Sequence, residues 1–270
     1  MKLLLLMSLM ISYAQAYTLN NNFGARFKNN DIKVTVDQFS TCASAGITVY
    51  DLEDLIAPSV DDFWNKVPTS SIKLKADGFN PGVTNINTGR LCAPTDSDCL
   101  TAAGSTVIAP VEGIVIACNN NATNFGSANV IAVTIPNNFS GKSITGAVIL
   151  INESSTVFAG LSKADRIGVI SHEIGHAIGL GHTEDKAALM YFRTVELRKT
   201  LGEDDMRGVS YLYPMQVDGF GLLGGCGTIQ TGSGTPASPP SWQMGAALAL
   251  MILLIEGRKL LNRSKARSST

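Results

Sequence analysis

The sequence predicts an α+β fold in which helices pack against a buried mixed sheet. Three runs of apolar, largely β-branched residues are separated by turns rich in Asn, Gly and Ser, as is typical of buried strands. These runs are 113–118, 129–135 and 146–151. Two longer segments, 49–67 and 161–181, instead repeat apolar residues at spacings of three and four, as amphipathic helices do.

The chain begins with a segment typical of a secretory signal peptide. Lys2 precedes an apolar run, and Ala14-Gln15-Ala16 forms a small-x-small cleavage site. The alternative, a transmembrane helix, requires a longer apolar run. We expect residues 1–16 to be removed on export, so that the mature chain starts near Tyr17 and lies outside the cytoplasm.

The elements of the first half follow in order. Residues 31–39 alternate apolar and polar side chains and are predicted to form a strand. Within the helical segment 49–67, Pro58 should kink or split the helix, because proline lacks the N–H group that an interior position needs. A second strand is predicted at 70–75, and residues 76–112, rich in Gly, Pro, Thr and Asn, are predicted to be a long loop.

After the three apolar runs the pattern becomes helical. Ser162, followed three residues later by Asp165, resembles a capping box at the start of the helix in segment 161–181. Gly179 should end this helix, since glycine adopts left-handed backbone conformations at low cost. A last helix is predicted at 202–213, where acidic residues in the first turn suit the helix dipole.

The C-terminal part has a different composition. Residues 215–240 are predicted to be a Gly/Ser/Pro linker. Residues 241–261 are predicted to be a transmembrane anchor, since an apolar run here precedes the basic tail 262–270, which would be cytoplasmic. A buried C-terminal helix is one alternative. A sorting segment processed near Cys226 is another.

The net charge, length and cysteine count narrow the classes of protein to which the chain can belong. The net charge of −1 gives no reason to expect a nucleic-acid partner. The roughly 200 residues between signal and tail suffice for one core. There are five cysteines, and export favours two disulfides with one remaining thiol over buried reduced cysteines.

All three histidines of the chain lie within eleven residues, 172–182. His172 and His176 are four residues apart and would share one face of a helix, where both can bind a zinc ion. This is the H-E-x-x-H pattern, in which Glu173 lies beside the metal as a general base. If the chain turns back at Gly179, His182 becomes a third ligand and leaves the fourth position open, as in catalytic sites. The alternative is a structural zinc site, which gives Glu173 no role.

The segment as a whole resembles the metzincin metallopeptidases. The full pattern is H-E-x-x-H-x-x-G-x-x-H, and Met190 in "AALMYF" matches the methionine turn that follows it in metzincins. Within that group "HEIGHAIGLGH", "ALMY", "LGEDDMRGVSYLYP" and "DDFWNKVPTSSIKLK" resemble the matrixins, the matrix-metalloproteinase family. Phe192 and Thr183 differ from the residues expected in astacins and adamalysins. The resemblance covers roughly residues 31–214, and is weak before 161.

The resemblance implies a peptidase domain over residues 17–214. It would contain a twisted mixed five-stranded sheet with one antiparallel edge strand, an active-site helix and a C-terminal helix. An extended protein or peptide substrate would pair with the edge strand, expected at 129–135. Met190 would form an apolar floor under the imidazoles, and Asp205, with Asp204, would support the methionine turn.

The resemblance also bears on metals and disulfides. One catalytic Zn²⁺ is implied, whereas Ca²⁺ is possible but has no clear ligands. Because the first and third strands of the matrixin sheet are parallel neighbours, Cys42–Cys118 is one expected pair. Cys92 and Cys99 share one loop and are the other expected pair, which leaves Cys226 free or modified. "RLCAPTD" (90–96) faintly resembles a cysteine switch, in which Cys92 would bind the zinc.

These observations predict a zinc-dependent endopeptidase, secreted or membrane-anchored and monomeric. Its location would be periplasmic, cell-surface or extracellular. The alternative function is an anchored binding or structural module whose zinc is not catalytic.

Overall fold

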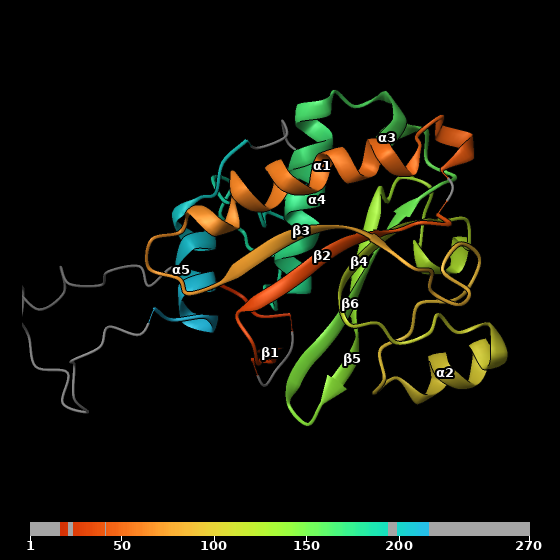
Figure 1. The fold of residues 1–270 in the computed structure, drawn as a ribbon, viewed down its shortest axis with the longest axis horizontal. Coiled ribbons are helices and arrows are strands. Elements are labelled where there is room, and N and C mark those ends of the chain that lie inside the picture. Colours follow the sequence, from red (N-terminus) through yellow and green to blue (C-terminus); the bar gives the residue numbers. More distant parts are fainter. Residues whose placement is uncertain (1–16, 21–23, 41, 194–198, 216–270) are drawn as a thin grey trace, which may run out of the picture. The chain divides into compact units, whose positions relative to one another are not determined.

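The computed structural model describes residues 17–20, 24–40, 42–193 and 199–215. These residues contain a six-stranded sheet (Figure 1). The strands are β1 (Arg26–Phe27), β2 (Asp31–Asp37), β3 (Lys73–Asn80), β4 (Gly113–Asn119), β5 (Ala132–Ser140) and β6 (Ser143–Asn152). The order is β3-β2-β4-β6, with β5 antiparallel to β6 at the edge and every other pairing parallel. The mixed sheet with one antiparallel edge strand is therefore present.

The sheet differs from the prediction in three details. It has a sixth strand, β1, whose two residues pair with Ser143 and Ile144 and are too few to show a periodicity. Strand β3 continues past the predicted end at 75 through Gly78, which has φ +68°, and its register with β2 shifts between Val34 and Val36. Strand β5 starts at Ala132 rather than at 129.

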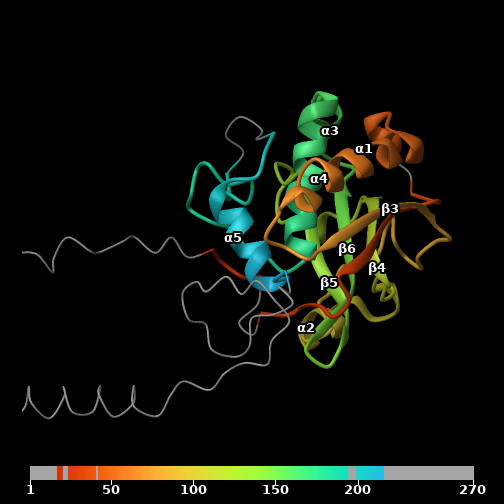
Figure 2. The same ribbon diagram turned by 60° about the vertical axis from the view of Figure 1, so that its left-hand side comes forward.

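One face of the sheet is covered by two long helices, α1 (Val49–Asp61) and α4 (Lys163–Ala177), which pack against each other (Figure 1, Figure 2). Their apolar sides bury a common core against the strands. Its largest fully buried side chains include Trp64, Leu52, Ile56, Ile114, Ile149 and Ile170. At roughly 25 cal/mol per Å² of buried apolar surface, this core is the main stabilising contribution to the domain.

Helix α1 continues through Pro58 to Asp61, so the split predicted there does not occur. Proline removes only the hydrogen bond to the carbonyl of Asp54, and Asp54 is exposed to water, which can replace it. Beyond the helix, the single turn Trp64–Lys66 completes the segment.

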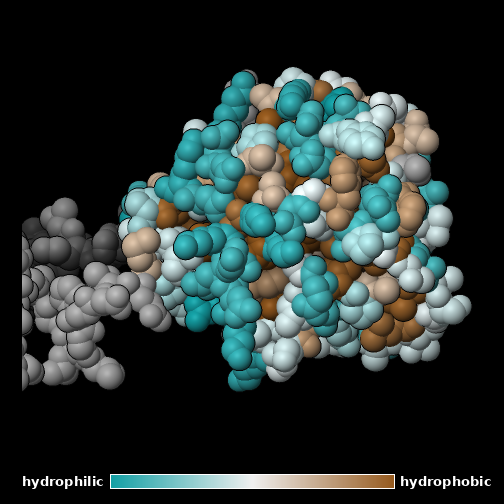
Figure 3. Space-filling model, in the orientation of Figure 1, coloured by the Kyte–Doolittle hydropathy of each residue, from teal (hydrophilic) through white to brown (hydrophobic). Residues whose placement is uncertain are grey.

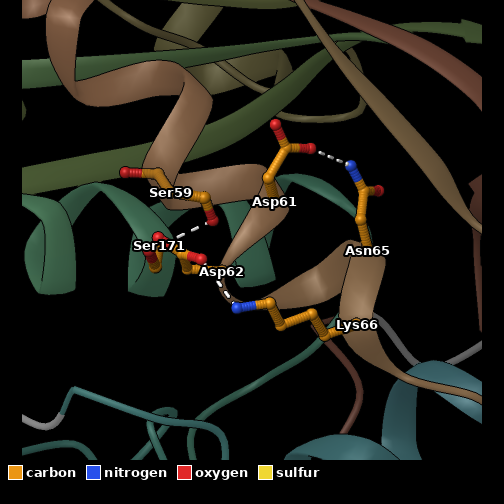
Figure 4. Close-up of polar contacts among 6 residues, drawn as sticks. All are labelled: Ser59, Asp61, Asp62, Asn65, Lys66 and Ser171. Atoms are coloured by element: carbon orange, nitrogen blue, oxygen red, sulfur yellow. Dashed lines mark hydrogen bonds and ion pairs between the residues drawn. The ribbon is translucent and has the colours of Figure 1, made fainter.

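Polar contacts join α1 to α4 and to the turn that follows it (Figure 4). The Ser171 hydroxyl donates to the carbonyl of Ile167 at 2.8 Å and also lies 3.3 Å from the carbonyl of Ser59. The Trp64 indole N–H donates to the carbonyl of Ser171 at 2.9 Å. At the end of α1 the pairs Asn65–Asp61 and Lys66–Asp62 hold the following turn. Ser171, which precedes His172, is thus held by α1 and by the turn that follows α1.

The other face is covered by the segment between β3 and β4. It was predicted to be a loop, but it contains the helix α2 (Ser97–Ala103), which Asp96 caps by accepting from the N–H of Cys99 at 2.9 Å. Asparagine side chains bind the backbone of this segment. Asn119, for example, donates to the carbonyls of Ile86 and Gly89 at 2.8 and 3.1 Å. Side-chain amides replace the backbone pairing that an irregular segment lacks.

Two disulfides are present, with the pairing that the resemblance implied. Cys42–Cys118 joins the segment after β2 to the end of β4, and its Cα atoms lie 5.4 Å apart. Cys92–Cys99 holds the start of α2, with Cα atoms 5.6 Å apart. Since Cys92 is bonded, its thiolate is not available to a metal as a cysteine switch would require. Cys226 lies outside the described residues.

The remaining helices are α3 (Thr156–Gly160) and α5 (Glu203–Leu212). Tyr213, which follows α5, is fully buried and donates its hydroxyl to the carbonyl of Ile178 at 2.8 Å. On the face in Figure 3, hydrophilic side chains cover much of the surface, with apolar groups showing between them. In the part of the chain that the structure describes, no helix is both long and apolar enough to cross a membrane. The predicted signal peptide, anchor and tail lie outside it, as does the predicted linker beyond Met215.

Candidate metal centre and cleft

Helix α4 carries the first two candidate ligands. It begins as predicted: the N–H of Asp165 donates to the Ser162 hydroxyl at 3.2 Å, and this hydroxyl donates to the Asp165 carboxylate at 2.7 Å. His172 and His176 then lie one turn apart, and their ring centroids are 4.8 Å apart.

The turn after α4 brings in the third histidine. The N–H of Leu180 donates to the carbonyl of Gly175 at 2.9 Å, and that of Gly179 to the carbonyl of His176 at 3.1 Å. This is the paired pattern of a Schellman turn. Gly179 has φ +113°, and a Cβ there would lie 2.6 Å from the carbonyl oxygen of Ala25. Glycine is therefore required for the chain to reverse and bring His182 beside the helix.

The three imidazoles converge on one point. The Nε2 atom of His182 lies 3.3 Å from that of His172 and 3.1 Å from that of His176. One ligand atom from each ring lies within 4.8 Å of the others. Among the described residues, this is the group of three or more metal-ligating side chains that the structure brings together.

The hydrogen bonds of the rings fit a shared cation. Nδ1 of His172 faces the carbonyl oxygen of Leu189 at 2.7 Å, and Nδ1 of His176 faces that of Leu180 at 2.9 Å. A carbonyl can only accept, so both Nδ1 atoms carry the proton and both Nε2 atoms present lone pairs. Nε2 of His182 lies within 3.3 Å of both lone pairs, so either its own proton or a shared cation can satisfy them. A zinc ion fits this donor set.

The pKa values favour the neutral, ligating form of the rings. Burial, together with the neighbouring His172, lowers the pKa of His176 to about 3. The same two causes lower the pKa of His182. Both imidazoles therefore remain unprotonated at neutral pH, as a metal ligand must.

Glu173 lies beside the three rings and is 7% exposed. Its Oε2 accepts a hydrogen bond from the Thr134 hydroxyl on strand β5 at 2.6 Å. Burial raises the pKa of Glu173, while the adjacent His172 and the Thr134 hydroxyl act in the opposite direction. A raised pKa is what a carboxylate needs to accept and return a proton near neutral pH.

Met190 lies against the helix between the two ligands of α4. A Cβ added at Gly175 would lie 2.3 Å from the Met190 sulfur and 2.8 Å from the Trp64 ring. The absence of a side chain at Gly175 thus makes room for the methionine, which is 2% exposed. The apolar floor that Met190 would form under the imidazoles stays a prediction.

Asp205 in α5 holds the turn that contains Met190. Its carboxylate accepts from the N–H groups of Leu189 at 2.5 Å, Met190 at 3.0 Å and Gly202 at 2.7 Å. Burial raises the pKa of Asp205, and these three donors oppose the shift. Asp204 is also buried but lines a separate cavity beside His182.

The segment just after the predicted signal peptide contacts the back of the histidine turn. The N–H of Asn20 donates to the carbonyl of Gly179 at 2.9 Å, and that of Gly181 to the carbonyl of Thr18 at 2.9 Å. The Thr18 hydroxyl donates to the carbonyl of His182. The third ligand is therefore fixed by backbone pairing from the N-terminal side.

A cleft of about 320 Å³ opens onto the site between the edge of the sheet and the methionine turn. Residues 129–132 form one wall, α4 forms the floor with His172 and Glu173, and Leu189, Tyr191, Phe192 and Arg193 form the opposite wall. Asn129–Ile131, expected to be part of the strand, instead lead into β5 and line this wall. The cleft therefore reaches the sheet at Ala132, the first residue of β5.

Sequence reasoning identified His172, Glu173, His176, His182, Gly179, Met190 and Asp205, and the structure places them together. It did not identify Thr134, Gly175 or Trp64. A signal existed for Thr134: it is the one hydroxyl residue in the apolar run 129–135, and alternation along the strand places it on the same face as Ala132.

Comparison with known proteins agrees with this geometry. The matrixin family profile matches residues 117–214, which include β5, β6, α4, the methionine turn and α5. The chain is matrixin-like. This family consists of zinc-dependent endopeptidases, and the matched segment contains all three histidines and Glu173.

One curated relative is the 72 kDa type IV collagenase of Gallus gallus, which is 45% identical over 53 residues. The match covers 18% of this chain and 8% of the collagenase. It therefore supports a matrixin-like metalloprotease, while the collagenase's own substrate stays a property of that protein.

Proposed function

We propose that residues 17–214 form an exported zinc-dependent endopeptidase in which His172, His176 and His182 hold one zinc ion and Glu173 is the general base. The observation that carries the proposal is the convergence of three imidazole Nε2 atoms beside a buried carboxylate in a cleft. A structural zinc site would not need a buried carboxylate beside its ligands.

The chemistry divides between the ion and the chain. Zinc, when bound, polarises the scissile carbonyl and makes water more acidic. Glu173 takes the proton of the attacking water on its carboxylate and then passes it to the leaving amine nitrogen. Meanwhile the carbonyls of Leu189 and Leu180 hold two of the rings in the ligating tautomer.

We further propose that substrate binds in an extended form along the exposed edge of β5. Among the described strands, β5 pairs with β6 alone, and an added strand could pair with its other row of N–H and C=O groups. Main-chain pairing of this kind does not depend on the substrate sequence. Specificity would come from substrate side chains that contact the cleft. Calcium has no place in this mechanism and stays a possibility without identified ligands.

The location also stays a proposal. A signal peptide at 1–16 would export the protein, and 241–261 would anchor it or serve as a processed sorting segment. The domain would act as a monomer. Full-length protein should resist carbonate extraction from membranes, whereas a chain ending at Pro240 should be soluble and equally active. Free solubility of both forms without processing would rule out the anchor.

Chelation tests the proposed function. Wild-type protein with one zinc should cleave casein or gelatin, and a chelator should abolish cleavage while circular dichroism still shows the folded state. His182→Ala should weaken zinc binding and activity together. Unfolding on chelation, in a protein that cleaves nothing from a broad peptide library, would instead support the structural module.

A further inference from the structure

Strand β5 contributes more than an edge to the site. Its side chains alternate between the two faces of the sheet. Val133 and Ile135 pack against the apolar cluster on the face covered by the segment between β3 and β4. Ala132 packs on the opposite face, which the long helices cover. Thr134 therefore faces α4. Its register partner on β6, Ile149, belongs to the core on that same side.

The Thr134 side chain meets the proposed base. Its hydroxyl donates to Oε2 of Glu173 at 2.6 Å, a short distance typical of a hydrogen bond to a charged oxygen. Threonine is β-branched and has restricted rotation about χ1, so a strand fixes the direction of its hydroxyl. This contact engages Oε2 of the Glu173 carboxylate and restricts its rotation.

We propose that Thr134 is a positioning residue, which orients the Glu173 carboxylate and connects it to the strand along which substrate would pair. The inference rests on the proposed endopeptidase function and goes beyond it by assigning a role to a residue of the substrate-binding edge. A peptide that pairs with β5 would bind to the strand that also holds the base. Correct placement of the substrate and correct orientation of the carboxylate therefore depend on one element.

The test is a set of variants that separates orientation from folding. Thr134→Val keeps the shape and removes the hydroxyl, while Thr134→Ser keeps the hydroxyl and removes the methyl group. Thr35→Val is the matched control, because Thr35 is also a half-buried strand threonine whose hydroxyl donates to a backbone carbonyl, that of Ile114. Zinc content and thermal unfolding are measured for each, and kcat and KM are determined separately on a peptide substrate.

We expect Thr134→Val to keep one zinc and its fold but to lower kcat about 10- to 100-fold with little change in KM, the effect of losing a hydrogen bond to a charged group. Thr134→Ser should recover most of kcat, and Thr35→Val should match wild type. In a Glu173→Gln background, Thr134→Val should cause no further loss, because Thr134 acts through that carboxylate.

Two results would overturn the assignment: an unchanged kcat in zinc-loaded, folded Thr134→Val, or a serine variant as impaired as the valine variant. These outcomes differ from failure of the proposed function itself. In that case Glu173→Gln would cleave as well as wild type, whatever the Thr134 variants do.

Discussion

At the scale of single residues, the site depends on side chains that are absent as much as on those present. Gly175 stands between the two helical ligands, and its missing Cβ makes room for the Met190 sulfur and the Trp64 ring. Gly179 supplies the positive φ that returns the chain toward the helix. Both glycines serve the position of the histidines rather than their chemistry.

Gly175→Ala should therefore destabilise the domain. The new methyl group would overlap Met190 and Trp64, and overpacking of this kind costs about 1–3 kcal/mol of unfolding free energy. We expect lower zinc affinity as well, since the methionine turn must move. Urea unfolding and a zinc-competition assay measure both. Gly160→Ala is the control: nothing lies within 4 Å of a Cβ there, so it should be neutral or slightly stabilising. Equal behaviour of the two variants would contradict the packing argument.

The buried His176 should make the metal-free protein acid-sensitive. Its pKa is lowered to about 3 from an ordinary value of 6.5, so between these values the unfolded chain binds the proton and the folded chain does not. The effect of His176 on the free energy of unfolding is constant above pH 6.5. Below pH 6.5 the free energy of unfolding falls by about 1.4 kcal/mol for each pH unit. Unfolding free energies of wild type and His176→Gln at several pH values measure it. The wild-type curve should be the steeper one, and parallel curves would contradict the assignment.

At the scale of elements, three segments meet at the site: α4 with its turn, the methionine turn, and the edge strand β5. Asp205 of α5 connects the second of these to the body of the domain through three backbone N–H groups. The polar contacts of Ser171 with Ser59 and Trp64 connect α4 to α1 and to the turn that follows α1. The geometry of the ligands is thus maintained by contacts outside the ligand set.

Replacing Asp205 tests that connection. Asp205→Ala leaves three N–H groups without their acceptor, and we expect a loss of at least about 3 kcal/mol of unfolding free energy. Zinc affinity should fall with it. Glu203→Ala, in the same helical turn, removes an exposed carboxylate paired only with Arg207 among the described ion pairs, and should change stability by less than about 0.5 kcal/mol. A similar small effect for both variants would show that the turn does not depend on Asp205.

Prediction from the sequence succeeded where the determinants are local. The spacing of His172 and His176, the cap at Ser162 and the glycine at 179 each act within one or two helical turns, and the structure has all three features. Prediction failed where the structure of a segment depends on the strand or segment that it pairs with. Asp77-Gly78 resembles a turn, yet β3 continues through it because β2 lies alongside with a shifted register. The helix α2 and the role of Thr134 likewise depend on contacts between segments distant in sequence.

At the scale of the whole described domain, the two faces of the sheet are stabilised differently. The helical face is an apolar core with the site at its margin. The other face holds an irregular segment through asparagine side chains, the Cys92–Cys99 bond and a smaller apolar cluster. The apolar core therefore lies next to α4, where the histidines must keep fixed positions.

The central claim is that the cleft hydrolyses peptide bonds with Glu173 as its base, and Glu173→Gln tests it most directly. Glutamine keeps the shape of the side chain and can still meet Thr134, but it cannot accept the proton of water. The variant should retain one zinc and the wild-type fold while cleavage of casein falls by about 10²–10⁴-fold, the usual contribution of general acid–base catalysis. A zinc-loaded Glu173→Gln protein that cleaves casein at the wild-type rate would contradict the account.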